Sequence, residues 1–258
     1  LMTAIAGSKP PDVIQQDRFS VGEWAARDAF LPLDEFIAGD KLDLNEFYPA
    51  CIKEATYRGK VYALPRYTDD RALYYNKKLF REVGLDPARP PKTWDELFAC
   101  AKKCTRYDQF GSFTSIGFIP NWGNSWLYLY GWQNDGHFMS DDGRTCLLNE
   151  PQIVDALKWM VNFYDNFKGS EAINTFGATF QGGQYDAFFT GKIGMKIDGN
   201  WYLQQIALYA PDLEFGVVPA PVPTGKPFIT WSGGFSLAIP RGVKNTAAAW
   251  RFIKFATS

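Results

Sequence analysis

The chain has 258 residues and a formal net charge of -1 at pH 7, and this length suits one large or two modest domains. Hydrophobic residues make up 46% and charged residues 21%, which is typical of globular proteins and not of disordered ones. The near-neutral charge and the lack of a Lys/Arg cluster argue against nucleic-acid binding. No apolar run reaches transmembrane length, and no secretory signal is visible.

The first predicted element is a helix over residues 1–6 that ends at Gly7 and begins without an N-cap. Short strands and helices then follow one another along the chain. The expected strands cover residues 12–14, 61–64, 72–75, 116–119, 193–197, 215–218 and 235–239. The further expected helices cover residues 21–29, 76–83, 93–105, 125–132, 150–167, 184–190, 201–209 and 246–256.

Two of these helices carry strong local signals. Thr93 and Glu96 have the spacing of a capping box, in which each side chain hydrogen-bonds the backbone of the other residue. The segment 150–167 has apolar residues at helical spacing along one face. The alternation of strands and helices predicts an α/β fold, in which ligands bind at loops beyond the carboxyl ends of strands.

The four cysteines and the single histidine do not point to a metal site. Cys100 and Cys104 lie four residues apart on a predicted helix, which is a poor separation for a mutual disulfide. With His137 as the only histidine, a zinc cluster is not expected. The sequence contains neither a G-x-G-x-x-G motif nor a P-loop, so no cofactor is expected.

Five predicted loops combine tryptophan with acidic, amide and small residues. The candidate site residues, in chain order, are Asp17, Arg18, Tyr67, Asp69, Asp70, Asn121, Trp122, Trp126, Asp198, Asn200, Trp201, Trp231, Ser232 and Gly233. A sugar ring has apolar C–H faces that indole can cover and a girdle of hydroxyls that carboxylates and amides can bind. The combination therefore favours a carbohydrate site.

Each of these residues also has a purely structural explanation. Asp17 and Arg18 can be a turn with a surface ion pair, and Asp69 and Asp70 a solvated loop. The tryptophans at 122 and 126 are four residues apart and can form a core stripe on a helix. Trp201 can be a residue that packs its ring against the protein at the start of a helix. The agreement of five loops on one chemistry supports the carbohydrate interpretation.

Several ordered motifs resemble the family of extracellular solute-binding proteins that includes maltose-binding protein. The motifs are PDVIQQDRF at 11–19, LPLD at 31–34, GKVYALP at 59–65, YYNK at 74–77, PKTWDEL at 91–97, GKIGM at 191–195, DGNW at 198–201, FGVVP at 215–219 and WSGG at 231–234. They cover essentially the whole chain. Each motif is loose, and their order and spacing carry the resemblance.

The resemblance implies a two-lobe periplasmic-binding-protein-like fold with crossing hinge strands. Lobe one would comprise residues 1–111 and 214–258, and lobe two residues 112–213. Asp17 and Arg18 match an acidic–basic pair of the first lobe, Asp69 an acidic sugar ligand, and Trp201 a stacking tryptophan. Trp122 and Trp126 fall in the region of another aromatic contact of the family. Trp231 and Gly233 lie where many relatives meet the ligand.

The resemblance also implies a function. The protein would bind a sugar or oligosaccharide in the cleft between the lobes and deliver it to the membrane permease of an ABC importer. It would act as a monomer outside the cytoplasm, either in the periplasm or as a lipid-anchored protein, without nucleic acid, cofactor or catalysis. Relatives begin with a strand before the equivalent of Leu1 and continue with helices after the equivalent of Ser258. The chain is therefore expected to be truncated at both ends and to bind sugar weakly alone.

Two other functions stay open. Asp17 and Asp69 could serve as the acid/base pair of a glycoside hydrolase, although nothing singles them out among the other loop carboxylates. Ser232 lacks the first glycine of a nucleophile elbow, which disfavours serine hydrolysis. The arginines at 18, 66 and 71 keep a sugar phosphate or another anionic solute possible as the ligand.

Overall fold

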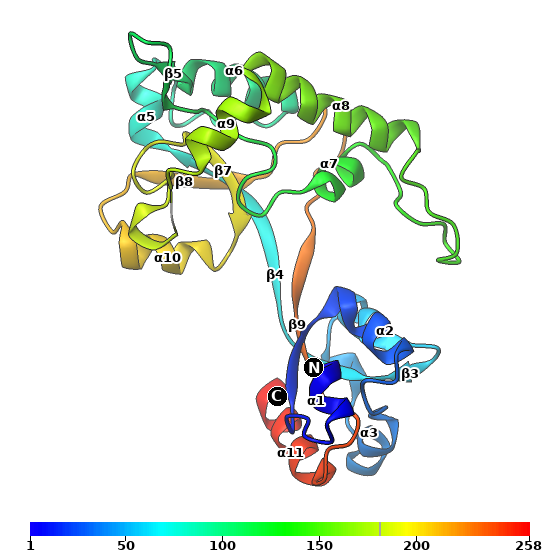
Figure 1. The fold of residues 1–258 in the computed structure, drawn as a ribbon. Helices are drawn as coiled ribbons and strands as arrows, with labels where there is room; N and C mark the ends of the chain where they lie inside the picture. The colour runs from blue at the N-terminus through cyan, green and yellow to red at the C-terminus, as the bar shows by residue number, and fades with distance from the viewer. Residues whose placement is uncertain (181) are drawn as a thin grey trace. The chain divides into compact units, whose positions relative to one another are not determined.

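A computed structural model describes residues 1–180 and 182–258. The chain forms two compact units, one of Leu1–Asp69 with Ser232–Ser258 and one of Asp70–Trp231. We call them unit 1 and unit 2. The chain leaves unit 1 within a long strand, β4 (Ala63–Asn76), and returns immediately before β9 (Ser232–Ala238) (Figure 1).

Unit 1 is built on β1, β9 and the first half of β4. Its other elements are α1 (Met2–Ala6), β1 (Ile14–Asp17), α2 (Arg18–Ala26), α3 (Asp34–Asp40), the 3-10 turn η1 (Leu44–Glu46), α4 (Pro49–Glu54), β2 (Thr56–Tyr57), β3 (Lys60–Val61) and α11 (Thr246–Thr257). β1 pairs with β9 in antiparallel register from Ile14↔Ala238 to Asp17↔Phe235. Apolar side chains such as Leu33, Leu64 and Ile253 form its core.

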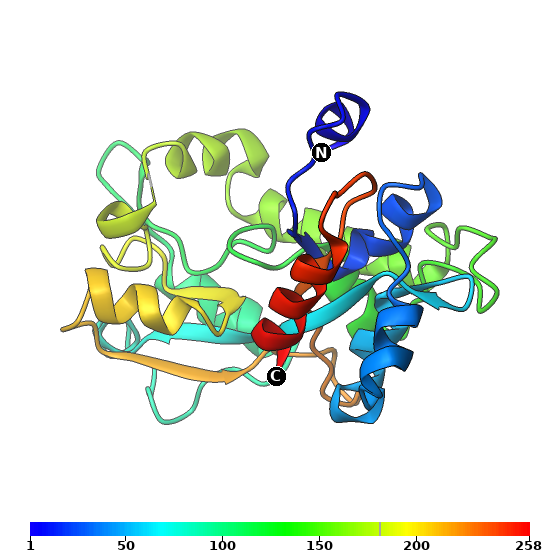
Figure 2. The ribbon, with the colours of Figure 1, turned by 90° about the horizontal axis from the view of Figure 1, so that it is seen from below.

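Unit 2 is built on the second half of β4, which pairs antiparallel with both β7 and β8. Leu73 lies opposite Ile197 of β7 and opposite Val218 of β8, and Figure 2 shows β8 running alongside β4. Its other elements are α5 (Lys77–Glu82), α6 (Trp94–Cys104), β5 (Arg106–Tyr107), β6 (Phe113–Ser115), α7 (Leu127–Gln133), α8 (Pro151–Asn166), α9 (Gly169–Gly177), the 3-10 turn η2 (Gly183–Tyr185), β7 (Met195–Gly199), α10 (Tyr202–Tyr209) and β8 (Phe215–Pro219).

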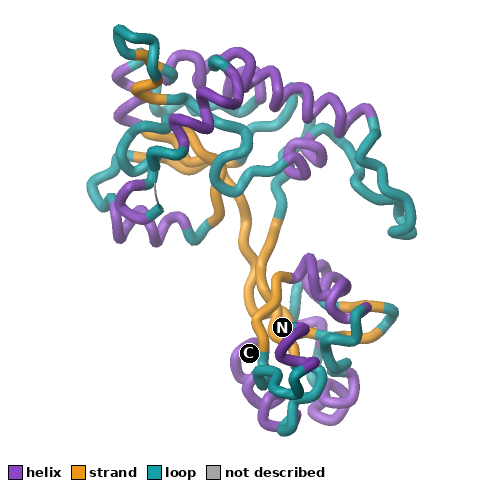
Figure 3. Tube along the Cα trace, viewed as in Figure 1, coloured by secondary structure: helices purple, strands orange, loops and turns teal. Residues whose placement is uncertain are grey.

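Two locally predicted helices form as expected. In α6 the hydroxyl of Thr93 accepts a hydrogen bond from the Glu96 N–H, and the Glu96 carboxylate accepts from the Thr93 N–H. α8 buries one face against the core of unit 2, through Ala156, Met160 and Phe163. The loop between α7 and α8 contains neither a helix nor a strand (Figure 3).

The clearest departure from the sequence prediction is β4. Residues 65–71, predicted as a loop, lie inside this strand of 14 residues. From Asp69 to Arg71 the residues alternate between buried, exposed and buried, as the pleat of a strand requires. Polar side chains occupy both faces there, so the sequence lacks the apolar alternation by which a strand is normally recognised.

Smaller differences occur elsewhere. Around residues 116–119 the structure contains only a single bridge, between Ile116 and Ile193. The helix predicted at 184–190 is reduced to the short η2 turn. β1 begins at Ile14, where the predicted strand ended. In the first two cases few residues form regular hydrogen bonds, whereas β1 is shifted along the chain because residues 14–17 pair with β9.

The predicted bounds of the lobes, 1–111 with 214–258 and 112–213, differ from the observed units. The physical reason is the pairing of β4. Residues 71–76 hydrogen-bond with β7 and β8, and the α5 and α6 helices that follow bury Leu79, Phe80 and Leu97 in the core of unit 2. Residues 70–111 and 214–231 therefore belong to unit 2.

All four cysteines are free thiols. Cys51, Cys100 and Cys104 are buried, whereas Cys146 is exposed in the α7–α8 loop. Among the described residues, no helix combines the length and the apolar character needed to cross a membrane.

Candidate functional site

An arginine of unit 2 lies over two indole rings. Arg71 is on β4, Trp201 immediately precedes α10, and Trp231 ends unit 2. The guanidinium carbon of Arg71 is 3.3 Å from the ring centre of Trp231 and 4.7 Å from that of Trp201. The Arg71 side chain is buried, so these cation–π contacts act where water screens them little.

Asn124 connects the arginine to Trp231. Its side-chain oxygen accepts a hydrogen bond of 2.8 Å from Nε of Arg71, and its carbonyl accepts from Nε1 of Trp231 at 3.3 Å. Its own N–H donates to the carbonyl of Ile197 on β7. Arg71, Asn124, Trp201 and Trp231 therefore form one assembly, which we call the arginine–indole cluster.

The indole of Trp201 packs directly on the backbone of Gly199. A Cβ at residue 199 would lie 2.1 Å from a ring carbon of Trp201, so only glycine leaves room for this contact. The Gly199 carbonyl accepts a hydrogen bond from the hydroxyl of Tyr74, and burial together with Asp198 raises the pKa of Tyr74 to about 12. Tyr74 thus stays protonated and keeps Gly199 in place.

Asp198 forms an ion pair and a hydrogen bond with residues close to it in the chain. Its carboxylate lies 3.0 Å from Nζ of Lys196, which lies equally close to Asp186. Asp198 also accepts a hydrogen bond from the Gly199 N–H, and Asp186 accepts one from the hydroxyl of Tyr202. Burial, followed by the nearby Asp186, raises the pKa of Tyr202. Asp198 therefore braces the loop that carries Trp201.

The two tryptophans of the 120–126 loop have different roles. Trp122 is half-buried and packs at the edge of the core, against Gly177 and against the ring of Phe180, with 6.4 Å between ring centres. Trp126 is 42% exposed. It lines a cavity of about 580 Å³ whose other polar or aromatic walls are Asn121, Tyr128, Tyr164, Ser170 and Asn174.

This cavity, which we call the α7–α8 cavity, adjoins the arginine–indole cluster. Tyr128 lines the cavity, and its ring packs edge-on against Trp231 with 5.1 Å between ring centres. The exposed amide of Asn121 and the exposed indole of Trp126 are the site residues that were predicted in this region. Asn200, next to Trp201, is exposed as well.

In unit 1, two of the predicted residues have structural partners. Asp17 caps α2 by accepting a hydrogen bond from the Phe19 N–H at 3.0 Å. Arg18 is buried, forms an ion pair with Glu54 at 2.6 Å and donates to the carbonyl of Tyr67. These contacts differ from the surface ion pair of the structural explanation, because Arg18 is buried and pairs with Glu54 instead of Asp17.

The remaining predicted residues of unit 1 gather where β4 meets β9. Asp69 accepts a hydrogen bond from the Gly233 N–H, and the hydroxyl of Ser232 lies 2.7 Å from that of Thr68. Tyr67 is 44% exposed and packs against Phe235 of β9. Asp70, the first residue of unit 2, is exposed.

Sequence reasoning missed the centre of the cluster. Arg71 had been considered only as a group that could bind an anion, and Asn124 and Tyr128 were not among the predicted site residues. The sequence offers no signal for Arg71, because residues 69–71 are polar on both faces of the strand and their alternation of burial appears only in the structure.

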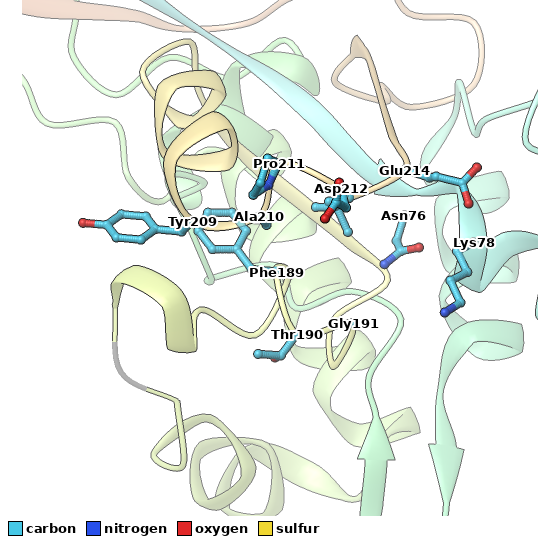
Figure 4. A pocket seen from close by; sticks show the side chains of 11 residues that line it. Asn76, Lys78, Phe189, Thr190, Gly191, Tyr209, Ala210, Pro211, Asp212 and Glu214 are labelled. Carbon is cyan, nitrogen blue, oxygen red and sulfur yellow. The ribbon is translucent and has the colours of Figure 1, made fainter.

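Another cavity of unit 2, of about 430 Å³, contains none of the predicted residues. The rings of Phe189 and Tyr209 lie at one end and the charged groups of Lys78 and Glu214 at the other (Figure 4). Glu214 is already paired with Arg81 at 2.7 Å. This cavity offers no indole, so the arginine–indole cluster with the α7–α8 cavity is the stronger candidate.

Comparison with known proteins identifies the fold family. The model of the family described as bacterial extracellular solute-binding protein matches residues 1–258. The maltotriose-binding protein of Pyrococcus abyssi is 27% identical over 265 residues, covering 100% of this chain and 53% of that protein. A maltooligosaccharide ABC transporter solute-binding lipoprotein of Streptococcus pneumoniae is 30% identical, covering 76% of this chain and 45% of the relative.

A solved structure, CpMnBP1 with mannotriose bound, superposes with a TM-score of 0.90 at 32% identity. The match covers 99% of this chain and 66% of that one. The chain spans about half the length of the two sequence relatives above. The predicted periplasmic-binding-protein-like α/β fold is confirmed by these neighbours, as is the predicted family. The chain belongs to the family of bacterial extracellular solute-binding proteins.

Proposed function

We propose that this chain is the sugar-binding part of an extracytoplasmic solute-binding protein that serves an ABC importer. Its ligand is an oligosaccharide, which it binds without altering it chemically. The observation that carries the proposal is the half-buried indole of Trp201, held beside Arg71 and next to the exposed amide of Asn200. Relatives named for maltotriose, maltooligosaccharide and mannotriose support the same ligand class.

In this proposal the ligand contacts of unit 2 come from two neighbouring regions. Trp201 covers an apolar face of one sugar ring, and Asn200 hydrogen-bonds its hydroxyls. Trp126 and Asn121 at the α7–α8 cavity give a second aromatic and amide pair. Trp231 is buried, so its role is to support the cluster and not to stack on ligand. The other predicted ligand contacts stay predictions; they are Asp17, Arg18, Tyr67, Asp69, Asp70, Trp122, Asp198, Ser232 and Gly233.

Binding without catalysis is the preferred form of the proposal. Asp17 and Asp69 each accept a backbone N–H, and Asp17 acts as a helix cap. Such contacts account for both carboxylates without a role in bond cleavage. The relatives are named as binding proteins, and one of them as an ABC transporter lipoprotein. We accordingly propose a membrane permease as partner, a monomeric state and a location outside the cytoplasm.

The test is a titration of intrinsic tryptophan fluorescence with mannotriose, maltotriose and glycerol 3-phosphate, extended to about 1 mM or above because binding of a few kcal/mol saturates only there. A saturable change with a trisaccharide, and no new product by chromatography, is the expected result. Saturation with glycerol 3-phosphate alone would favour an anionic ligand, and release of smaller sugars would establish a hydrolase.

A pair of variants on the same helix tests the stacking residue. Trp201→Leu should weaken trisaccharide binding about tenfold or more, because the indole face is lost. Tyr209→Leu removes a 45% exposed aromatic at the other end of α10 and should leave the affinity unchanged. Equal affinities of wild type and Trp201→Leu would show that Trp201 is not the stacking residue.

A further inference from the structure

Arg71 is a buried cation placed among site residues, and a cation buried in this way needs compensation. Removing a guanidinium from water costs several kcal/mol unless other groups replace the lost hydration. Here Trp231 and Trp201 lie within 3.3 Å and 4.7 Å of its carbon, and Asn124 accepts from Nε. The backbone is held too, since the Thr230 hydroxyl donates to the Arg71 carbonyl at 2.8 Å.

We propose that Arg71 is a positioning residue for sugar binding, which holds the indole of Trp201 in its binding orientation. The inference rests on the proposed function and adds a residue that acts through another. Trp231 is buried and fixed by Asn124, so it provides a rigid base for the guanidinium. The guanidinium in turn lies over Trp201, which also packs on Gly199 and against the cluster that contains Phe188 and Tyr202.

The geometry explains why an arginine is needed. Its planar group can stack on aromatic rings and donate from its edge to Asn124 at the same time. A lysine keeps the charge, but its ammonium group is compact and cannot do both. Without the guanidinium, the Trp201 ring gains rotational freedom that the ligand must remove on binding, and affinity falls because the site is no longer preorganised.

The test compares Arg71→Met and Arg71→Lys with a matched control. Arg81→Met removes an exposed arginine of the same unit that is paired with Glu214. Mannotriose affinity should fall about tenfold in Arg71→Met and nearly as much in Arg71→Lys, and stay unchanged in Arg81→Met. Full recovery in Arg71→Lys would mean that charge alone matters and would overturn the positioning role.

A double-mutant cycle separates positioning from direct contact. If Arg71 acts through the indole, Arg71→Met should cost little additional affinity in a Trp201→Leu background. Equal losses of affinity in both backgrounds would overturn the proposal and leave the sugar-binding function intact. Absence of saturable binding in the wild type would instead count against the proposed function.

A measurement without ligand tests the positioning itself. In protein labelled with 5-fluorotryptophan, the fluorine resonance of Trp201 is identified by its loss in Trp201→Phe. Arg71→Met should shift or broaden this resonance, whereas Arg81→Met should leave it in place. An unchanged Trp201 resonance in Arg71→Met, with the protein folded by circular dichroism, would overturn the proposal whether or not mannotriose binds.

Discussion

At the scale of single residues, chemical type predicts a carbohydrate site, and packing decides which of the predicted side chains are exposed. Trp122 and Trp201 look alike in the sequence, since each lies in a loop rich in asparagine and glycine. Both rings are half-buried, but Trp122 packs against Gly177 and Phe180, whereas Trp201 lies beside Arg71. The neighbours of the two rings, which the sequence does not show, distinguish Trp122 from Trp201.

Gly199 gives a direct prediction about the orientation of Trp201. Gly199→Ala would place a methyl group 2.1 Å from the indole, so the ring must move at a cost of about 1–3 kcal/mol in stability. We expect weaker mannotriose binding by fluorescence titration and a lower midpoint in thermal unfolding. Gly39→Ala is the control, because a Cβ there has no neighbour within 4 Å. An unchanged affinity in Gly199→Ala would show that mannotriose binding does not depend on the orientation of Trp201.

The cysteines give a second prediction, about thiol reactivity. Burial raises the pKa of Cys104 to about 12, and burial is also the main cause of the raised pKa of Cys100. Because the thiolate is the reactive form, iodoacetamide at pH 8 should modify exposed Cys146 first. Mass spectrometry of the digested protein checks the order. Modification of Cys104 at the rate of Cys146, before unfolding, would contradict the burial.

At the scale of elements, the segments with local signals form close to their predicted positions. The capping box at Thr93 starts α6, and the amphipathic segment of α8 runs from Pro151 to Asn166. β4 is the opposite case. Its residues 65–71 look like a loop in the sequence because polar side chains occupy both faces. They form part of a strand because β4 pairs with strands that are distant in the sequence.

The cap of α6 can be tested by a single substitution. Thr93→Ala removes the acceptor for the Glu96 N–H and should lower the free energy of unfolding by about 1 kcal/mol. Denaturation by urea, followed by circular dichroism, measures the loss. Thr175→Ala, at an exposed position inside α9, should be neutral or slightly stabilising. If both variants lowered the free energy of unfolding equally, the loss in Thr93→Ala would not be due to the helix cap.

At the scale of the whole molecule, the two units differ in the number of chain segments that form them. Unit 2 is one continuous segment, Asp70–Trp231, and contains the largest apolar cluster among the described residues. Unit 1 depends on β1 and β9, which come from opposite ends of the chain. The arginine–indole cluster lies entirely within the continuous unit.

This organisation predicts that residues 70–231 fold independently. The isolated segment should unfold cooperatively on heating and keep the near-ultraviolet circular dichroism of its packed aromatics, since its core pairs are internal. Residues 1–69 without 232–258 lack β9, the partner of β1, and should not unfold cooperatively. A segment 70–231 without a thermal transition would show that unit 2 requires unit 1.

The sequence alone determined the fold class and the family, which the comparisons confirm, and it suggested the chemistry of the proposed site. These depend on local patterns, such as the capping box, the GKIGM and DGNW motifs, and tryptophan beside amide and carboxylate. Only the tertiary structure decided the bounds of the units and the place of Arg71 at the centre of the cluster. Both follow from contacts between distant segments, for example Leu73 with Ile197 and Arg71 with Trp231. Such contacts arise when several elements pack at once, and no local pattern encodes them.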